Sequence, residues 1–348
     1  MTTETMTETR TNPLRMKGIA FVEWSAPSQE GLQSLHRLFL GLGFSRLMRH
    51  RDRDVDLYRQ NDILFVLDKD EGSFARSFAD AHGPCISGLG LAVEDAQAAS
   101  GAAAARGATA PGRPTLYRSP ALVGIGGMQL HLVEVGERPV FMQDFLPLES
   151  PDRVPDRGFL AIDHLTNNVP KGTLAEYRRF YREVFGFTDV RTFDIRGQST
   201  GLTSYALRSP CGTFCLPINE GSEEKSQIEE YLREYRGPGV QHLALSTRDL
   251  LRSLEGLTIP TLDIDPAYYE TVFERVPNVR EDKAAIRDHA VLVDGDEQGY
   301  LLQIFTQNVA GPIFFEMIQR ENHQSFGEGN FSALFRSIER DQERRGVI

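Results

Sequence analysis

Hydrophobic and polar residues follow the same order of patterns in the two halves of the chain. In the first half, an apolar strand pattern over 18–24 precedes a helical pattern with leucines at 32, 35, 38 and 42, a Gly-Phe turn and the strand pattern DILFVLD. In the second half, the same order runs from FLAIDHLT at 159–166 through a helical pattern to a Gly-Phe turn at 186–187. Apolar residues three and four apart predict helices, and alternation predicts half-buried strands. The repeat therefore predicts two copies of one scaffold.

The repeat continues after these first strands. The strand pattern of 85–95 and the Ala-rich helical run that follows it correspond to 239–249 and the leucine-bearing helix after that segment. Aligning Asp95 with Asp249 places Gly88 opposite His242. Short runs punctuated by glycine and proline, such as TSYALRSPCGTFCLPINE, predict hairpin strands between these elements. Each half is thus expected to contain two βαβββ units.

Length and local composition predict where the domains begin and end. A chain of 348 residues holds about two domains. The segment LPLESPDRVPDR, rich in proline and charge, is typical of a linker. The Thr-rich N-terminal stretch lacks the apolar core of a signal peptide and is expected to be a disordered tail. The expected division is a tail at 1–15, an N-terminal domain at 16–145, a linker at 146–158 and a C-terminal domain at 159–348.

Composition and charge narrow the class of partner. Apolar residues make up 40% and charged residues 25%, the balance of an ordinary globular protein. Lys plus Arg number 38 against 49 Asp plus Glu, and the net charge of −11 argues against nucleic acid or an anionic membrane as the main partner. No stretch approaches the roughly 18 to 20 apolar residues of a membrane span. Three cysteines without a CxxC pair favour a reducing compartment, so we expect a cytoplasmic protein that acts on a small molecule.

Two of the eight histidines and one glutamate interrupt apolar strand patterns in the second half. His164 and His242 lie on the predicted inward faces of AIDHLT and VQHLALS. Glu316 lies in IFFEMIQ, where an unpaired buried carboxylate is costly. Each residue alone fits a hydrogen-bonded core histidine or a glutamate paired with an arginine. Together, on three strands of one half, they indicate a 2-His-1-carboxylate site, which suits Fe(II) and, by ligand type alone, also catalytic zinc.

The C-terminal segment predicts an amphipathic helix over 330–345. Asn330 is a good N-cap residue, and apolar side chains at 331, 334, 335 and 338 define one face that must be buried. Gly346 ends the helix, and the glycines at 327 and 329 before it suit a hinge. The segment is either a plain docked helix or a lid.

Several segments in a fixed order resemble the 4-hydroxyphenylpyruvate dioxygenase family of the vicinal oxygen chelate superfamily. They include IDHLTNNV, TGLTSYAL, LPINE, GVQHLAL, LLQIFTQ, GPIFFEMIQR and FGEGNFSALFRSIERDQERRG, and the resemblance covers the chain after residue 15. It implies an α+β fold of two tandem glyoxalase/bleomycin-resistance-like domains, each of two βαβββ units forming an open barrel, plus a C-terminal lid helix. It also implies a homodimer or homotetramer built through an N-terminal structural domain, and a catalytic C-terminal domain.

The resemblance also implies a reaction and its residues. The implied activity is a non-haem Fe(II) dioxygenase that converts 4-hydroxyphenylpyruvate and O2 to homogentisate and CO2 in tyrosine and phenylalanine catabolism. The implied iron ligands are His164, His242 and Glu316. The implied catalytic amides are Gln227, Gln241 and Gln303, and the implied substrate-binding residues are Ser204, Pro217, Asn219, Phe305, Phe315, Phe326, Asn330, Phe331 and Phe335.

Two alternative functions stay open. 4-Hydroxymandelate synthase uses the same substrate and iron but hydroxylates the benzylic carbon, and Pro217 with Phe305 favours the dioxygenase over it. A metal-free binding protein of the same fold is the second alternative, and it would leave Glu316 unexplained. The segments LEGLTIPTLDID and HAVLVDGDEQGYLL are shorter than the family pattern, which changes loops between His242 and Glu316 without touching the ligands.

Overall fold

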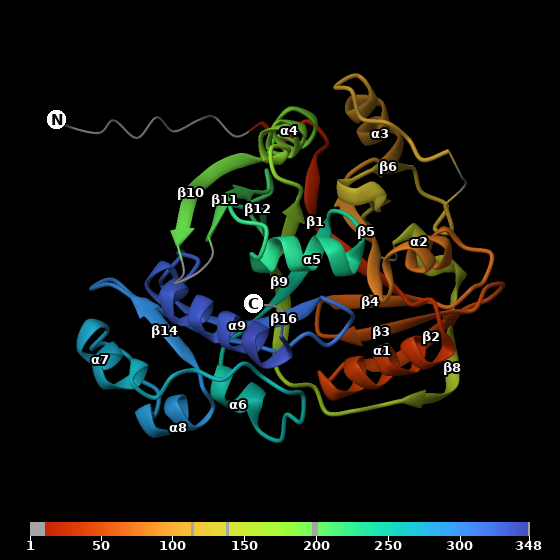
Figure 1. Cartoon of the computed structure of the whole chain (residues 1–348). Coiled ribbons are helices and arrows are strands. Elements are labelled where there is room, and N and C mark those ends of the chain that lie inside the picture. The colour runs from red at the N-terminus through yellow and green to blue at the C-terminus, as the bar shows by residue number, and fades with distance from the viewer. Residues whose placement is uncertain (1–10, 113–114, 137–138, 197–200, 347–348) are drawn as a thin grey trace.

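The computed structural model describes residues 11–112, 115–136, 139–196 and 201–346 (Figure 1). Among the described residues of its N-terminal half, the helices are α1 (Gln29–Gly41), α2 (Phe74–His82) and α3 (Ala96–Ala104), and the short 3-10 turns are η1 (Ile125–Gly127) and η2 (Val140–Asp144). The strands of this half are β1 (Met16–Ser25), β2 (Ser45–His50), β3 (Val55–Gln60), β4 (Ile63–Asp68), β5 (Cys85–Val93), β6 (Ala121–Val123), β7 (Gln129–Glu134) and β8 (Phe145–Asp152).

The C-terminal half has the same kinds of element and a longer final helix. Its strands are β9 (Phe159–Val169), β10 (Thr188–Arg196), β11 (Gly201–Arg208), β12 (Cys215–Gly221), β13 (Gly239–Thr247), β14 (Leu292–Gly295), β15 (Tyr300–Phe305) and β16 (Phe314–Glu321). Its helices are α4 (Leu174–Phe180), the π-helical turn η3 (Tyr181–Phe185), α5 (Gln227–Tyr235), α6 (Leu250–Leu254), α7 (Tyr268–Arg275), α8 (Lys283–Asp288), the 3-10 turn η4 (Glu328–Asn330) and α9 (Phe331–Arg345).

The two halves form two curled eight-stranded sheets whose strand orders match. The N-terminal order is β6-β7-β5-β1-β4-β3-β2-β8, and the C-terminal order is β10-β11-β12-β9-β13-β16-β15-β14. When the C-terminal order is read backwards, β15-β16-β13-β9-β12-β11-β10 corresponds strand by strand to β6-β7-β5-β1-β4-β3-β2. The predicted α+β fold of two copies of one scaffold is therefore confirmed. One difference is that β8 lies beyond β2, on the edge opposite β6 and β7.

Short polar residues begin helices at matching places in the two halves. Ser28, Ser73 and Ser226 each accept a hydrogen bond from the backbone amide three residues later, at the start of α1, α2 and α5. Asp95 and Asp249 do the same for α3 and α6. These caps explain where the five helices begin, because each satisfies a backbone amide of the first turn.

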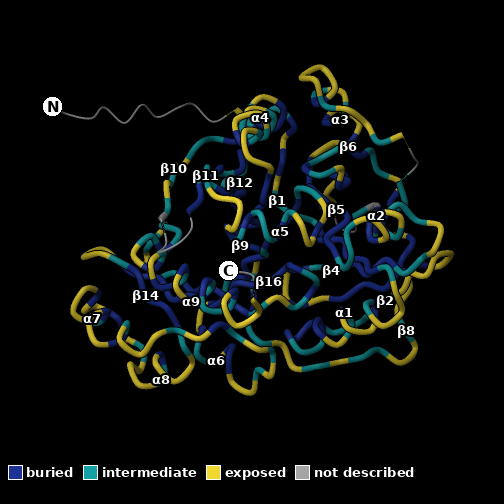
Figure 2. The backbone as a smooth tube through the Cα atoms, in the orientation of Figure 1, coloured by how far each residue is buried: buried dark blue, intermediate teal, exposed yellow. Residues whose placement is uncertain are grey.

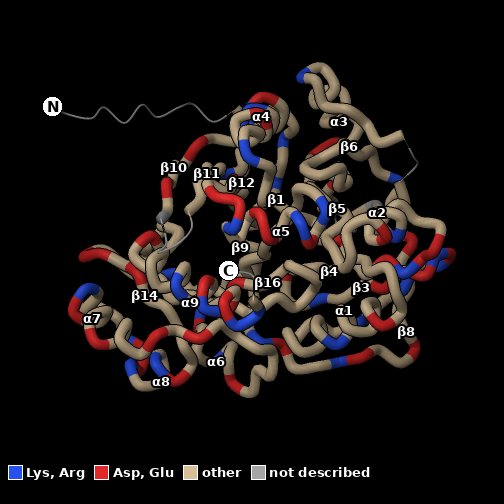
Figure 3. Tube along the Cα trace, viewed as in Figure 1, with Lys and Arg blue, Asp and Glu red and all other residues tan. Residues whose placement is uncertain are grey.

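The strands β5 and β15, neither of which is an edge strand, are buried on both faces (Figure 2). All nine residues of β5 and all six of β15 are buried, because helices cover the outer faces of the sheets and the curl covers the inner faces. Charged residues of both signs are interspersed along the helices and loops (Figure 3).

None of the helices in the described part of the chain combines the length and apolarity needed to cross a lipid bilayer. The three cysteines are free thiols.

Aromatic stacking and one arginine join the two halves. Trp24 on β1 stacks on Phe315 of β16, with ring centroids 5.7 Å apart and planes 18° from parallel. Arg157 donates hydrogen bonds to the carbonyl oxygens of Gly41 at 2.7 Å and of Glu255 at 2.8 Å, which lie in different halves. The core therefore continues across the boundary between the sheets.

Two expectations about the connecting segments need revision. Residues 1–10 of the predicted tail lie outside the described residues, but Leu14 is buried and Asn12 exchanges hydrogen bonds with Met16, so packed structure begins before residue 16. The segment 146–158 was expected to be a linker, yet its first part belongs to β8, which pairs with β2. The physical reason is that β2 would otherwise leave a row of backbone groups unpaired at the sheet edge.

Gly126 provides a test of the contact between the halves. Its φ is +67°, and a Cβ at this position would collide with the carbonyl oxygen of Pro238 from the other half. We expect Gly126→Ala to lower the free energy of unfolding by about 2 kcal/mol or more, through the left-handed backbone and the clash. Chemical denaturation followed by fluorescence measures the effect.

Gly101→Ala on α3 is the matched control, because a Cβ there meets nothing within 4 Å. It should leave stability unchanged or raise it by about 0.5 to 1 kcal/mol through helix propensity. Equal effects of the two substitutions would contradict the proposed role of Gly126.

Candidate metal centre

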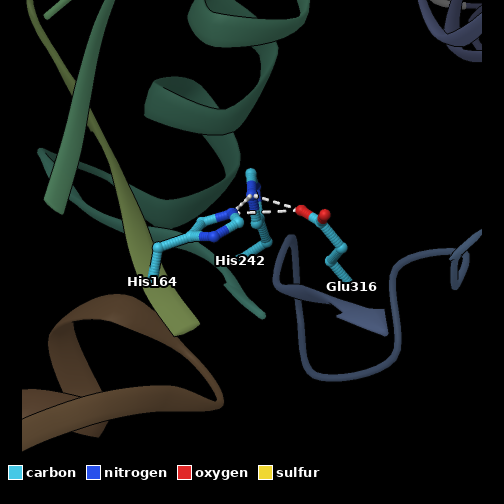
Figure 4. A group of neighbouring side chains, drawn as sticks. All are labelled: His164, His242 and Glu316. Atoms are coloured by element: carbon cyan, nitrogen blue, oxygen red, sulfur yellow. Dashed lines mark hydrogen bonds and ion pairs between the residues drawn. The ribbon is translucent and has the colours of Figure 1, made fainter. Parts of the chain in front are cut away.

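Three adjacent strands bring the two histidines and the glutamate together (Figure 4). In the central strand β13, Ala244 pairs with His164 of β9 on one side and with Glu316 of β16 on the other. His242 lies two residues before Ala244 and therefore on the same face of β13. His164 Nε2 lies 3.1 Å from Glu316 Oε2 and 3.3 Å from His242 Nε2, and His242 Nε2 lies 3.5 Å from Glu316 Oε2.

This triangle fits a single metal ion. With metal–ligand bonds of about 2.1 Å, neighbouring ligands of an octahedral or tetrahedral ion lie about 3.0 to 3.4 Å apart. Two neutral imidazoles and one carboxylate on one side leave further coordination positions for other ligands, the arrangement typical of non-haem Fe(II). In the described part of the chain, His164, His242 and Glu316 are the one set of three such side chains that converges in this way.

Hydrogen bonds to the far ring nitrogens direct both Nε2 atoms toward the centre. His164 Nδ1 lies 2.8 Å from Asp163 Oδ1, and His242 Nδ1 lies 3.1 Å from Gln241 Oε1. Asp163 is itself held by Arg320, whose Nε and Nη2 donate to its two carboxylate oxygens at 2.8 and 2.9 Å. Acceptors at Nδ1 keep the proton there and leave Nε2 free to bind a metal.

Burial and mutual charge shift the pKa values of these groups. Burial alone would raise the pKa of Glu316, but the adjacent histidines lower it to about 2. Burial opposes charge on His164, yet Glu316 and Asp163 raise its pKa to about 9. Burial lowers the pKa of His242. Burial would also raise the pKa of Asp163, but Arg320 and His164 hold it well below its usual range. The metal-free site therefore carries a carboxylate beside an imidazolium.

A cavity of about 90 Å³ opens on the ligands and is closed by α9. Strands of the C-terminal sheet supply most of its lining, and Phe326 contacts the ring of His164 with centroids 5.7 Å apart. Most of the residues predicted for the site line this cavity together with the three ligands, namely Ser204, Pro217, Asn219, Gln227, Gln241, Gln303, Phe305, Phe326, Phe331 and Phe335.

Two predicted substrate-binding residues do not line the cavity. Phe315 lies on the opposite face of β16 from Glu316 and stacks on Trp24, because neighbouring residues of a strand point to opposite faces. Asn330 is buried at the N-cap position of α9 but makes no capping hydrogen bond. Its Oδ1 instead accepts from the hydroxyl of Tyr268 at 2.7 Å, which ties the start of α9 to α7.

Several cavity residues were missed by the sequence analysis. The period-two pattern through Glu316 and His164 would have indicated Phe314 and Thr166, and the apolar face of the C-terminal helix already contained Leu334 and Ile338. No local pattern in the sequence would have indicated Phe193 and Ile195 of β10 or Leu202 of β11. The missed lining residues are Thr166, Phe193, Ile195, Leu202, Phe314, Leu334 and Ile338.

The segment before α9 approaches the site closely. Gly327 has a φ of +78°, and a Cβ on it would collide with the side-chain amide of Gln303. Gly329 donates its backbone amide to Asp294 at 3.0 Å, and Asp294 pairs with Arg275 at 2.6 Å. Gly327 is thus a position where the backbone passes directly against the cavity wall, whereas Gly329 packs against the pair of Asp294 and Arg275.

Comparisons with known proteins agree with this architecture. Residues 10–145 match the family model described as hydroxyphenylpyruvate dioxygenase, N-terminal, and residues 161–258 match the glyoxalase/bleomycin resistance protein/dioxygenase superfamily. Protein MelA of Shewanella colwelliana is 51% identical over 97% of this chain and 99% of its own length. The 4-hydroxyphenylpyruvate dioxygenase of Pseudomonas aeruginosa is 42% identical over 97% of both chains. A solved mutant of 4-hydroxymandelate synthase from Streptomyces coelicolor has a TM-score of 0.79 at 25% identity, over 94% of this chain and 99% of its own.

Metal affinity should rise with pH. A pKa of about 9 means that His164 is protonated in the metal-free protein at neutral pH, and a metal must displace that proton to reach Nε2. We expect the affinity for Co(II), an oxygen-stable substitute for Fe(II), to increase up to about tenfold per pH unit between pH 6 and 8. Calorimetric titration at several pH values measures this slope, and an affinity independent of pH would contradict the assigned protonation state.

Asp163 should contribute to metal binding without touching the metal. Asp163→Asn removes the negative charge and replaces one of the two acceptor oxygens with an NH2 donor, so the side chain can no longer accept from both His164 Nδ1 and Arg320 Nε. We expect the affinity for Co(II) to fall by about 10- to 100-fold, the usual effect of removing an outer-shell partner. Asp62→Asn, at an exposed turn, is the control and should bind as wild type. Unchanged affinity in Asp163→Asn would show that the ring of His164 needs no such support.

Proposed function

The chain belongs to the 4-hydroxyphenylpyruvate dioxygenase family, and we propose that it converts 4-hydroxyphenylpyruvate and O2 to homogentisate and CO2. One O2 molecule supplies both the new ring hydroxyl and one carboxylate oxygen, and the carbon lost as CO2 is the original carboxyl carbon. The observation that carries the proposal is a 2-His-1-carboxylate triangle at the end of a cavity lined by amides and phenylalanines.

His164, His242 and Glu316 would hold Fe(II), which supplies the chemistry of O2 activation when bound. The substrate carries its own 2-oxo acid, so no second organic acid is needed as a source of electrons. The triangle of ligand atoms leaves the cavity side of the site free for the 2-oxo acid end of the substrate.

The remaining cavity residues would bind and orient the aromatic end. Phe305, Phe331 and Phe335 offer apolar walls to a flat ring. Asn219 and Gln303 offer hydrogen bonds to a phenol, and Gln303 Oε1 is buried without a partner among the described residues. A buried polar atom without a partner favours a polar ligand group at that position.

The lid would exclude water from the reaction. Leu334, Phe335 and Ile338 of α9 close the cavity, and Phe326 covers His164. Exclusion of water protects a reactive intermediate from side reactions and strengthens the electrostatic contacts that orient the substrate.

The second candidate is 4-hydroxymandelate synthase activity, which the structural similarity to that enzyme favours. The two reactions share the substrate and O2 but differ in the carbon that is hydroxylated. Pro217 and Phe305 both line the cavity and support the dioxygenase reading, because they would limit where the ring can sit.

Product analysis tests the proposed reaction. Purified protein is incubated with Fe(II), ascorbate, 4-hydroxyphenylpyruvate and O2, and the products are separated by chromatography. We expect homogentisate, with one CO2 released for each O2 consumed. 4-Hydroxymandelate without homogentisate would overturn the proposal in favour of the second candidate, and the absence of both metal binding and turnover would favour a binding protein.

Substitution of a ligand tests the site assignment. Glu316→Gln should lower both metal content and turnover by more than the roughly 100-fold that outer-shell changes cause. Glu297→Gln, at an exposed loop, is the control and should keep both. Full turnover in Glu316→Gln would show that the metal is held elsewhere.

A further inference from the structure

The N-terminal sheet contains a second cavity at the place that corresponds to the metal centre. In β5, Gly90 pairs with Phe21 of β1 and with His131 of β7, just as Ala244 pairs with His164 and Glu316. Phe21 thus takes the place of His164, and His131 takes that of Glu316. A cavity of about 260 Å³ lies on this face.

Polar side chains of this cavity come from β1, β4 and β7, of which β1 and β7 match the strands β9 and β16 that carry His164 and Glu316. Glu23 lies two residues after Phe21 on β1, and Asp68 ends β4. Gln129 and His131 come from β7, and all four line the cavity and are at most 3% exposed. The curl of the N-terminal sheet has therefore kept a polar pocket although the metal ligands are absent.

Two of these polar groups lack partners. Neither ring nitrogen of His131 has a hydrogen-bond partner among the described residues, and the same holds for Gln129 Nε2. His131 Nε2 and Glu23 Oε2 approach the same point, since a Cβ on Gly88 would lie 3.1 Å from the first and 2.9 Å from the second. Buried polar groups are normally satisfied, so the acceptor nitrogen of His131 points to a missing ligand that donates a hydrogen bond, whereas Gln129 Nε2 is itself a donor and needs an acceptor.

Acidic side chains outnumber basic ones among the described residues that line the cavity. Glu23 accepts hydrogen bonds from Ser87 at 2.7 Å and from the hydroxyl of Tyr117, but both donors are neutral. Burial raises the pKa of Glu23, and burial together with Glu23 raises the pKa of Asp68 to about 8. Of the described lining residues, the one Lys or Arg is Arg53, which is 54% exposed and lies 3.6 Å from Asp70.

We propose that this cavity binds a small organic cation through an ammonium group held by Glu23, Asp68 and His131. Burial lowers the pKa of His131 to about 3, so its ring is neutral and one nitrogen can accept an N–H. A bare metal ion fits less well, because the described groups that converge to metal-ligating distance are those of the C-terminal half. Phe74 and Leu116 line the same cavity and suit the methylene groups of an alkylamine.

Calorimetric titration of the full chain tests the proposal. The probe is n-butylammonium chloride in phosphate buffer, and tetramethylammonium chloride at the same ionic strength is the reference, because it has the charge without an N–H. We expect n-butylammonium to bind at least tenfold more tightly than the reference. Equal or undetectable binding of both would overturn the proposal.

Variants locate the binding to this cavity. Glu23→Gln combined with Asp68→Asn should weaken n-butylammonium binding at least tenfold, whereas Asp80→Asn, at an exposed position of α2, should not. Binding retained by the double variant would overturn the assignment of these residues. Turnover of 4-hydroxyphenylpyruvate is measured in parallel and is expected to persist, since the cavity belongs to the other sheet.

A tethered ammonium provides a test that does not depend on the double variant folding. Gln129→Lys places an ammonium beside Glu23 and Asp68, and Gln129→Met is the neutral control of similar size. We expect Gln129→Lys to melt at a higher temperature than Gln129→Met and to bind no added n-butylammonium. A lower melting temperature for Gln129→Lys would show that the cavity does not accept an ammonium group.

Discussion

Backbone hydrogen bonds between β13 and its two neighbours hold Ala244 beside both His164 and Glu316. A shift of one residue in either pairing would turn a ligand to the opposite face of the sheet, because side chains alternate along a strand. The register in turn depends on the burial of the central strands, whose apolar residues face either the helices or the curl of the sheet. The metal centre is thus a consequence of how three strands pair rather than of a local motif.

The same arrangement explains how a carboxylate can be buried in an apolar strand. Glu316 faces two imidazoles, and Asp163 beside His164 is held by Arg320, so each buried charge has a partner of opposite sign or a hydrogen-bond donor. Arg320 also donates to the carbonyl oxygens of His323 and Ser325, which precede Phe326. Arg320 therefore both supports His164 through Asp163 and holds the segment that leads into α9.

The repeated scaffold encloses two cavities with different chemistry on matching faces of its two sheets. Where the C-terminal half has His164 and Glu316, the N-terminal half has Phe21 and His131, and the polar character has moved to Glu23 and Asp68. The curl of a sheet encloses space on its inner face whatever side chains line it. The chemistry of that space depends on the individual side chains that line it. One scaffold can therefore hold a candidate metal centre in one half and an acidic pocket in the other.

Much of the candidate site could be predicted from the sequence, and the failures have a common cause. Ligand types, the strands that carry them and the apolar face of the last helix follow from local patterns. Phe315 was assigned to the site although Trp24, nearly 300 residues away in the chain, stacks on it from the other half. Asn330 was expected to cap a helix, but Tyr268 offers its side chain a hydrogen bond at 2.7 Å.

The sequence by itself determined the order of the elements, the repetition of the scaffold and the half that bears the candidate metal ligands, because periodicity and residue type are local properties. Only the tertiary structure decided the distances within the ligand triangle, the partnership of Asp163 with Arg320 and the acidic cavity beside Gly88. Each of these depends on contacts between residues far apart in the chain. Such contacts are set by strand register and packing, which no local pattern specifies.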